Sequence, residues 1–225
     1  DKNMAAAVDA AVDEAAAAVE ATSLNDEDEG PSGPDPRIAK LKAYMEDHSP
    51  AEVAAVVQTD EYSKGNIVIN DTLCMNKQGV ASYILVMAAF GTDVEAFTAN
   101  PMSKQVKANK ALLKAYANET PKNRIPLLGA MEAAMLASEE ARVAEGTRKN
   151  NEVYQVLCEL FNADVMGDEE EEATAIYMDW EEKQNISKEF GLEEEAAEKV
   201  RELSQPFFDW LEQAEESDEE ITISY

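Results

Sequence analysis

Two stretches near the end of the chain place aromatic residues directly beside blocks of carboxylates. Residues 159–182 read ELFNADVMGDEEEEATAIYMDWEE, and residues 206–225 read PFFDWLEQAEESDEEITISY. In the second stretch Phe207, Trp210 and Leu211 recur at helical spacing, with acids on the other face. Carboxylates attract ammonium groups, and aromatic rings are common anchors in interfaces. We therefore expect the two stretches to form one acidic surface for a basic partner.

The residues expected to contact this partner are the acids and rings of both stretches: Asp164, Asp168, Glu169, Glu170, Glu171, Glu172, Trp180, Glu181, Glu182, Phe207, Trp210, Glu212, Glu215 and Glu216. Core packing is the competing interpretation for both tryptophans, and it is compatible with a half-buried ring at an interface edge. Residues 168–172 precede an apolar helix and should lie on a folded surface. Residues 218–220 are typical of a solvated tail.

Catalysis is not indicated by these residue types. Contiguous acids such as residues 169–172 point around a helix, whereas acid/base catalysis needs carboxylates that converge in a pocket. His48 precedes Ser49-Pro50 and is typical of a cation at a helix C-terminus. The two cysteines lack ligand spacing, and no phosphate-binding or calcium-binding loop is present in the sequence. We expect no catalytic residue, no metal and no cofactor.

The acids are concentrated in the last third of the chain. Residues 1–36 carry ten acids and one base, residues 37–150 carry 13 acids and 14 bases, and residues 151–225 carry 24 acids and four bases. A net charge of −28 argues against direct contact with nucleic acid. The longest apolar run, residues 80–90, is far shorter than the roughly 20 residues of a membrane span. We expect a basic protein partner and a cytoplasmic location, with no membrane contact.

The composition divides the chain into three parts. Residues 1–36 combine an alanine-rich stretch with Gly, Pro and acids and are expected to form a disordered acidic linker. Because the chain begins at Asp1, we interpret it as a piece of something longer. Residues 37–216 are expected to form a helical domain, and residues 217–225 a loose acidic tail.

Helix signals follow one another through the helical domain. Asp35-Pro36 starts a helix that should end near His48, and Ser49 with Glu52 forms a capping box. Further helices are expected over residues 70–90, 93–99, 102–118, 121–136 and 150–161. Residues 67–69 have strand propensity. No neighbouring stretch shows the alternation of apolar and polar residues expected of a pairing strand, so we interpret residues 67–69 as a buried connector. The pattern predicts an all-α fold, a HEAT-type α-solenoid of antiparallel helix pairs.

A row of lysines lies outside the acidic stretches. Lys104, Lys107, Lys110 and Lys114 fall at helical spacing on one face, and Lys122 and Arg124 follow. The row is either a solvated helix face or a second surface for another partner. Separately, Ser217 precedes Asp218-Glu219-Glu220, a sequence suited to phosphorylation by an acid-directed kinase.

The two acidic stretches resemble the acidic-aromatic boxes of the two-tryptophan HEAT domain at the C-terminus of eukaryotic translation initiation factor 5 and of the epsilon subunit of initiation factor 2B. Box one corresponds to residues 157–183, with Trp180-Glu181-Glu182 after the acids. Box two corresponds to residues 198–220, with Pro206-Phe207 and Trp210-Leu211 as fixed points. The likeness spans residues 37–220, and the ending over residues 220–225 is more similar to factor 5.

The resemblance implies an assembly role in translation initiation. Domains of this kind bind lysine-rich segments of the beta subunit of initiation factor 2, for which the epsilon subunit of factor 2B competes. Initiation factors 1 and 3 are further implied partners, and contact with the ribosomal preinitiation complex is indirect. The GTPase-activating N-terminal domain of factor 5 is not in this chain, so no enzyme activity is implied. A catalytic guanine-nucleotide exchange domain like that of factor 2B epsilon is the alternative, and a generic acidic adaptor is a third possibility.

Overall fold

The computed structural model describes residues 34–69, 72–74, 76–146, 151–183 and 185–217. The chain divides into two units, and a compact unit begins at Asp35. Most of the expected linker (residues 1–36) and of the expected tail (residues 217–225) lies outside the described residues. The three-part division of the chain therefore stays a prediction.

The first helices begin where the sequence places their caps. Helix α2 (Pro36–Asp47) is capped by Asp35, whose Oδ1 accepts a hydrogen bond of 2.9 Å from the backbone N–H of Arg37. Helix α3 (Pro50–Val57) starts with the predicted capping box of Ser49 and Glu52. Local side-chain chemistry thus sets the start of both helices.

A short β-hairpin follows the one-turn helix α4 (Asp60–Ser63). Strand β1 (Ile67–Ile69) pairs with β2 (Thr72–Cys74) in antiparallel register, so the prediction of an unpaired connector was wrong. The predicted helix over residues 70–90 begins only at Lys77. The register leaves Asn70 and Asp71 between the paired ends, and these are residue types that favour tight turns. Strands of three residues are too short to show a clear alternation in the sequence.

The other helices follow in the predicted order, apart from a short helix over residues 185–189 that was not predicted. They are α5 (Lys77–Ala89), α6 (Val94–Ala99), α7 (Met102–Glu119), a 3-10 turn η1 (Pro121–Asn123), α8 (Arg124–Glu145), α9 (Glu152–Asn162), α10 (Glu170–Glu182), α11 (Asn185–Glu189) and α12 (Glu194–Ser217). Pro126 lies in the first turn of α8, where a missing N–H removes no helical hydrogen bond. Helix α8 continues well beyond the predicted end at residue 136.

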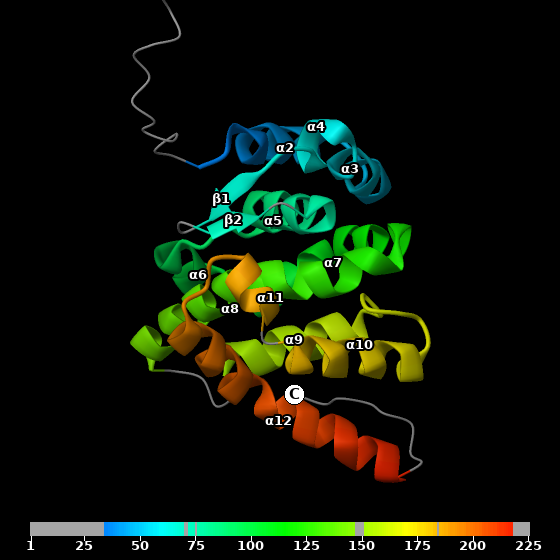
Figure 1. Cartoon of the computed structure of the whole chain (residues 1–225). Coiled ribbons are helices and arrows are strands. Elements are labelled where there is room, and N and C mark those ends of the chain that lie inside the picture. The colour runs from blue at the N-terminus through cyan, green and yellow to red at the C-terminus, as the bar shows by residue number, and fades with distance from the viewer. Residues whose placement is uncertain (1–33, 70–71, 75, 147–150, 184, 218–225) are drawn as a thin grey trace, which may run out of the picture. The chain divides into compact units, whose positions relative to one another are not determined.

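The helices pack as successive layers around one core (Figure 1). Helix α2 contacts α5, α3 contacts α7, both α5 and α6 contact α8, α7 contacts α9, and α9 contacts α12. Apart from one two-stranded hairpin, the described residues contain only helices, which confirms the all-α, HEAT-like fold class. None of the described helices has the length and apolar character needed to cross a membrane.

Side chains of later helices complete the start of α7. The backbone N–H of Met102 donates to Ser138 Oγ at 2.9 Å, and that of Ser103 donates to Glu152 Oε1 at 2.7 Å. The backbone N–H of Glu152 in turn donates to Glu139 Oε2 at 2.6 Å. Pro101, the N-cap residue of α7, makes no side-chain hydrogen bond to the helix. Buried side chains of α8 and α9 therefore tie consecutive layers together.

Candidate partner-binding surface

The aromatic residues of the two boxes meet in one cluster between α9, α10 and α12. The ring centroids of Tyr177 and Phe207 lie 5.0 Å apart in an edge-to-face arrangement. Phe161 lies 5.4 Å from Trp210 and 6.1 Å from Phe207. Edge-to-face contacts at these distances favour a fixed packing of the rings. The cluster thereby holds the helix of box one against the helix of box two.

Trp180 is tied to a buried ion pair behind this cluster. Its Nε1–H donates to Glu132 Oε1 at 2.8 Å, and Arg201 Nη2 donates to the same oxygen at 3.0 Å. The Arg201 guanidinium carbon lies 4.1 Å from the centroid of the Trp180 ring, a cation–π contact. Burial raises the pKa of Glu132, and the Arg201 charge opposes that shift. Three helices, α8, α10 and α12, are thus joined at one buried carboxylate.

The structure corrects the expected role of two aromatic residues. Trp180 and Phe207 are both 0% exposed, so neither ring offers surface to a partner. Trp210 is partly exposed at the edge of the cluster. An apolar residue at helical spacing looks the same in sequence whether it faces a core or a partner, which is why the sequence did not separate these cases. The two buried rings position the carboxylates beside them.

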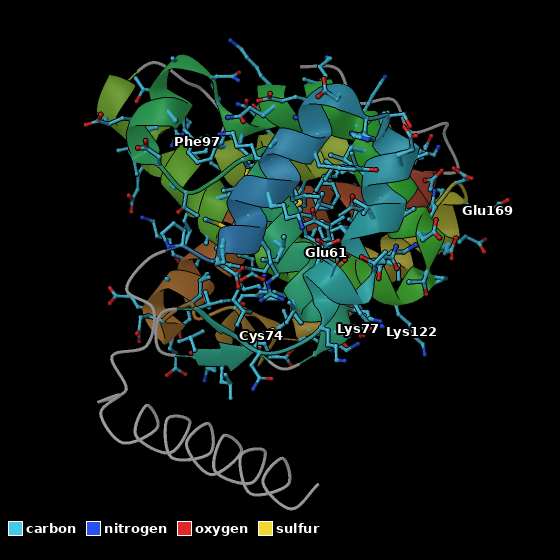
Figure 2. All side chains as sticks on the ribbon, turned by 90° about the horizontal axis from the view of Figure 1, so that it is seen from above. Glu61, Cys74, Lys77, Phe97, Lys122 and Glu169 are labelled. Carbon is cyan, nitrogen blue, oxygen red and sulfur yellow. The ribbon has the colours of Figure 1, made fainter. Side chains whose placement is uncertain are left out.

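The outer carboxylates of box one lie at the start of α10. Glu169, Glu170 and Glu171 are exposed, and Figure 2 shows Glu169 at the periphery, pointing away from the core. Among the described residues no cation lies within ion-pair distance of these three side chains. Acids are favoured at a helix N-terminus, because the free N–H groups carry partial positive charge. At the other end of α10, Glu182 is exposed and Glu181 is partly exposed.

The inner carboxylates of box one are bound by the chain's own cations. Lys114 Nζ on α7 lies 2.8 Å from Asp168 Oδ1 and 3.3 Å from Asp164 Oδ2. Arg124 Nη1 at the start of α8 lies 2.5 Å from Glu172 Oε1. The Lys114 ammonium lowers the pKa of Asp168, and Asp168 raises the pKa of Lys114. In the part of the chain that the structure describes, no group of three or more His, Cys, Asp or Glu is placed to hold a metal ion.

The loop before α10 has a backbone shape that suits these ion pairs. Asp164 has a φ of 51°, in the left-handed region that aspartate tolerates better than most residues. Gly167 has a φ of 155°, and a Cβ atom there would lie 2.9 Å from Glu172 Oε2. Glycine therefore leaves the space that the Glu172 carboxylate occupies beside Arg124.

The acids of box two are only partly described. Glu212 on α12 is exposed. Glu215, Glu216 and Ser217 belong to the last turn of α12, but their side chains lie outside the described residues, as do residues 218–220. The structure thus brings together the rings of both boxes, and their role in binding a partner stays a prediction.

The predicted lysine row contacts box one through Lys107 and Lys114. Lys107 Nζ lies 3.6 Å from Glu159 Oε1, and Lys114 binds the acidic loop as described above. Lys104 and Lys110 are exposed, and neither has an ion pair within the described part of the chain. Of the four lysines of the row, these two have no ion pair among the described residues, and Lys122 beyond the row is exposed as well.

A protein family model matches the part of the chain that contains both boxes. Residues 124–220 match the W2 family model. Its description is eIF4-gamma/eIF5/eIF2-epsilon, and the matched residues include both boxes and helices α8 to α12. The W2 match supports a role in translation initiation, with interaction with initiation factors in general. No curated protein and no solved structure matched the chain.

Two residues that hold box one in place, Glu132 and Arg201, were not singled out from the sequence. Glu132 lies in an apolar part of α8, and Arg201 is a base in a strongly acidic helix. A single charged residue in an apolar segment, or among residues of opposite charge, often pairs with a residue elsewhere in the fold. That signal was present in the sequence, although it does not tell which residues pair.

Proposed function

We propose that this chain is a translation initiation scaffold in the cytoplasm whose acidic surface binds lysine-rich segments of the beta subunit of initiation factor 2. Initiation factors 1 and 3 are further proposed partners, through which the chain helps to assemble the preinitiation complex. The supporting observation is a group of exposed carboxylates, Glu169, Glu170 and Glu171, on a helix held by a rigid aromatic cluster. The proposal assigns binding to the chain and no catalysis.

The charge distribution supports fast and salt-sensitive binding. Residues 151–225 carry 24 acids and four bases, so a lysine-rich segment is attracted before any close contact forms. Salt weakens such attraction because the screening length shortens to about 3 Å at 1 M salt. A flexible basic segment would lose conformational freedom on binding, which keeps its affinity moderate.

Binding of a lysine-rich peptide from the beta subunit of initiation factor 2 tests the proposal. Glu169, Glu170 and Glu171 are changed together to Gln. A matched control changes Glu193, Glu194 and Glu195 to Gln, three exposed acids at the start of α12 and outside both boxes. Both variants lose the same formal charge. We expect fluorescence anisotropy at low salt to show binding weakened roughly tenfold by the first variant, with a much smaller effect of the control.

Two results would overturn this assignment. One is an unchanged chain that fails to bind the peptide at low salt, or binds it equally well at high salt. The other is a control variant that loses as much affinity as the box-one variant, because binding would then follow net charge and not this surface.

Nucleotide exchange is the second candidate, because the matching family description also names eIF2-epsilon. An exchange domain would accelerate release of GDP from initiation factor 2, whereas a scaffold would bind the factor without changing the rate of release. Release of a fluorescent GDP analogue, measured with and without the chain, separates the two functions.

A further inference from the structure

One cation of the chain lies inside the acidic loop of box one. Lys114 extends from α7 and places its ammonium between the carboxylates of Asp164 and Asp168, at 3.3 and 2.8 Å. These acids lie about fifty positions further along the chain, and the hydrogen bond from Lys114 to Asp164 spans 50 residues. The arrangement is that of a lysine side chain bound by two carboxylates.

The two cations of this loop differ in exposure. The Lys114 side chain is 38% exposed and its partner Asp168 is 72% exposed, so water reaches both charges. The Arg124 side chain is only 8% exposed beside Glu172 and also donates to Asn118 Oδ1. The Arg124 contact is therefore a fixed part of the fold, whereas the Lys114 contact is open to exchange.

We propose that Lys114 is an internal competitor, which occupies the site at Asp164 and Asp168 that a lysine of the partner segment takes on binding. The proposal rests on the function proposed above and adds a regulatory element to the same surface. Glu169, Glu170 and Glu171 provide the first attraction, and a partner ammonium then replaces that of Lys114. The incoming and outgoing groups have the same chemistry, so the exchange preserves the charge balance of the loop.

This competition lowers the affinity of the unchanged chain. A partner lysine gains its contact with Asp164 and Asp168 only after Lys114 has lost the same contact. Exposed ion pairs contribute little individually, so removal of the competitor should tighten binding by about two- to fivefold. If Lys114 instead served only to hold the loop in shape, its removal would disorder the acids and weaken binding.

The decisive comparison is between Lys114→Gln and Lys110→Gln, with the lysine-rich peptide as the probe. Lys110 lies one turn earlier on α7, is exposed, and has no ion pair among the described residues. Both variants add one unit of net negative charge, so long-range attraction changes alike. We expect Lys114→Gln to bind about two- to fivefold more tightly than Lys110→Gln. Equal or weaker binding by Lys114→Gln, with unchanged helix content by circular dichroism, would overturn the proposal.

A second variant tests which carboxylate receives the partner. Asp168→Asn should weaken binding more in the Lys114→Gln background than in the unchanged chain, because in the unchanged chain the partner's contact with Asp168 is offset by the loss of the Lys114 contact. Equal losses in both backgrounds would contradict competition at this site. If the unchanged chain does not bind the peptide at all, the proposed function itself has failed, which is a separate result from a failure of the competition.

Discussion

Substitution of Glu132 tests the buried centre that positions box one. Glu132 is fully buried and accepts hydrogen bonds from Trp180 Nε1 and Arg201 Nη2 through one oxygen. Glu132→Gln keeps an acceptor for the indole but removes the negative charge that balances Arg201. Glu132→Met removes both the charge and the acceptor. The two variants therefore separate the ion pair from the indole hydrogen bond.

The expected losses follow from the burial of these groups. A buried charge that loses its partner costs about 3 kcal/mol, and Arg201 would be left in that position by Glu132→Gln. The unpaired indole N–H of Trp180 in Glu132→Met adds about 1 to 2 kcal/mol. For a domain of this size each kcal/mol lowers the melting temperature by about 2 to 4 °C, so the Gln variant should melt about 6 to 12 °C lower.

Urea unfolding followed by circular dichroism measures both differences without relying on Trp180 fluorescence. A Trp180→Phe background is the control, because it has no indole N–H and the gap between the Gln and Met variants should narrow there to the part that comes from Arg201 Nη2. A Gln variant as stable as the unchanged chain would refute the ion-pair reasoning. A Gln variant and a Met variant of equal stability would refute the contribution of the indole hydrogen bond.

Three further predictions concern other parts of the chain. Gly129→Ala should destabilise the fold by about 1 to 3 kcal/mol in urea unfolding, because the new Cβ would lie 2.6 Å from Ile186 Cγ1; an unaffected midpoint would show that α11 can shift away. The hydrogen bonds from Arg37 lower the pKa of Asp35 from 3.8. The ionised Asp35 therefore stabilises the fold fully above pH 3.8, and this contribution to the free energy of unfolding is lost as the pH falls through the lowered pKa. The difference in unfolding free energy between the unchanged chain and Asp35→Asn should therefore shrink as the pH falls through 3.8 and below, and a constant difference would contradict this. Phosphate on Ser217 would add about two negative charges and tighten binding of the lysine-rich peptide, and mass spectrometry that finds Ser217 unmodified after treatment with an acid-directed kinase would remove the idea.

Features encoded by neighbouring residues could be predicted from the sequence. The capping box of Ser49 and Glu52 and the N-cap at Asp35 involve side chains within three residues of the groups they bind. These local contacts favour helix starts at Pro36 and Pro50 without any contribution from distant residues. The β-hairpin was missed because its signal is two turn-forming residues, Asn70 and Asp71, between strands too short to alternate visibly.

Features that depend on distant residues could not be predicted. Lys114 and Asp164 are 50 positions apart, and Trp180 and Glu132 are 48 apart. Periodicity shows that a residue lies on an apolar or polar face, but it does not show which face of another helix it meets. For that reason the lysine row and box one were interpreted as separate surfaces, although Lys114 joins them.

The caps shared between α7, α8 and α9 have a consequence for how the chain folds during synthesis. The N–H groups of Met102 and Ser103 find their acceptors in Ser138 and Glu152, which leave the ribosome tens of residues later. The first turn of α7 is complete only when α9 has begun. A fragment that ends before Arg124, the first residue of the W2 match, would leave these buried donors without acceptors. The boundary of the matched family segment is therefore no boundary for folding, and both sides of it should unfold together.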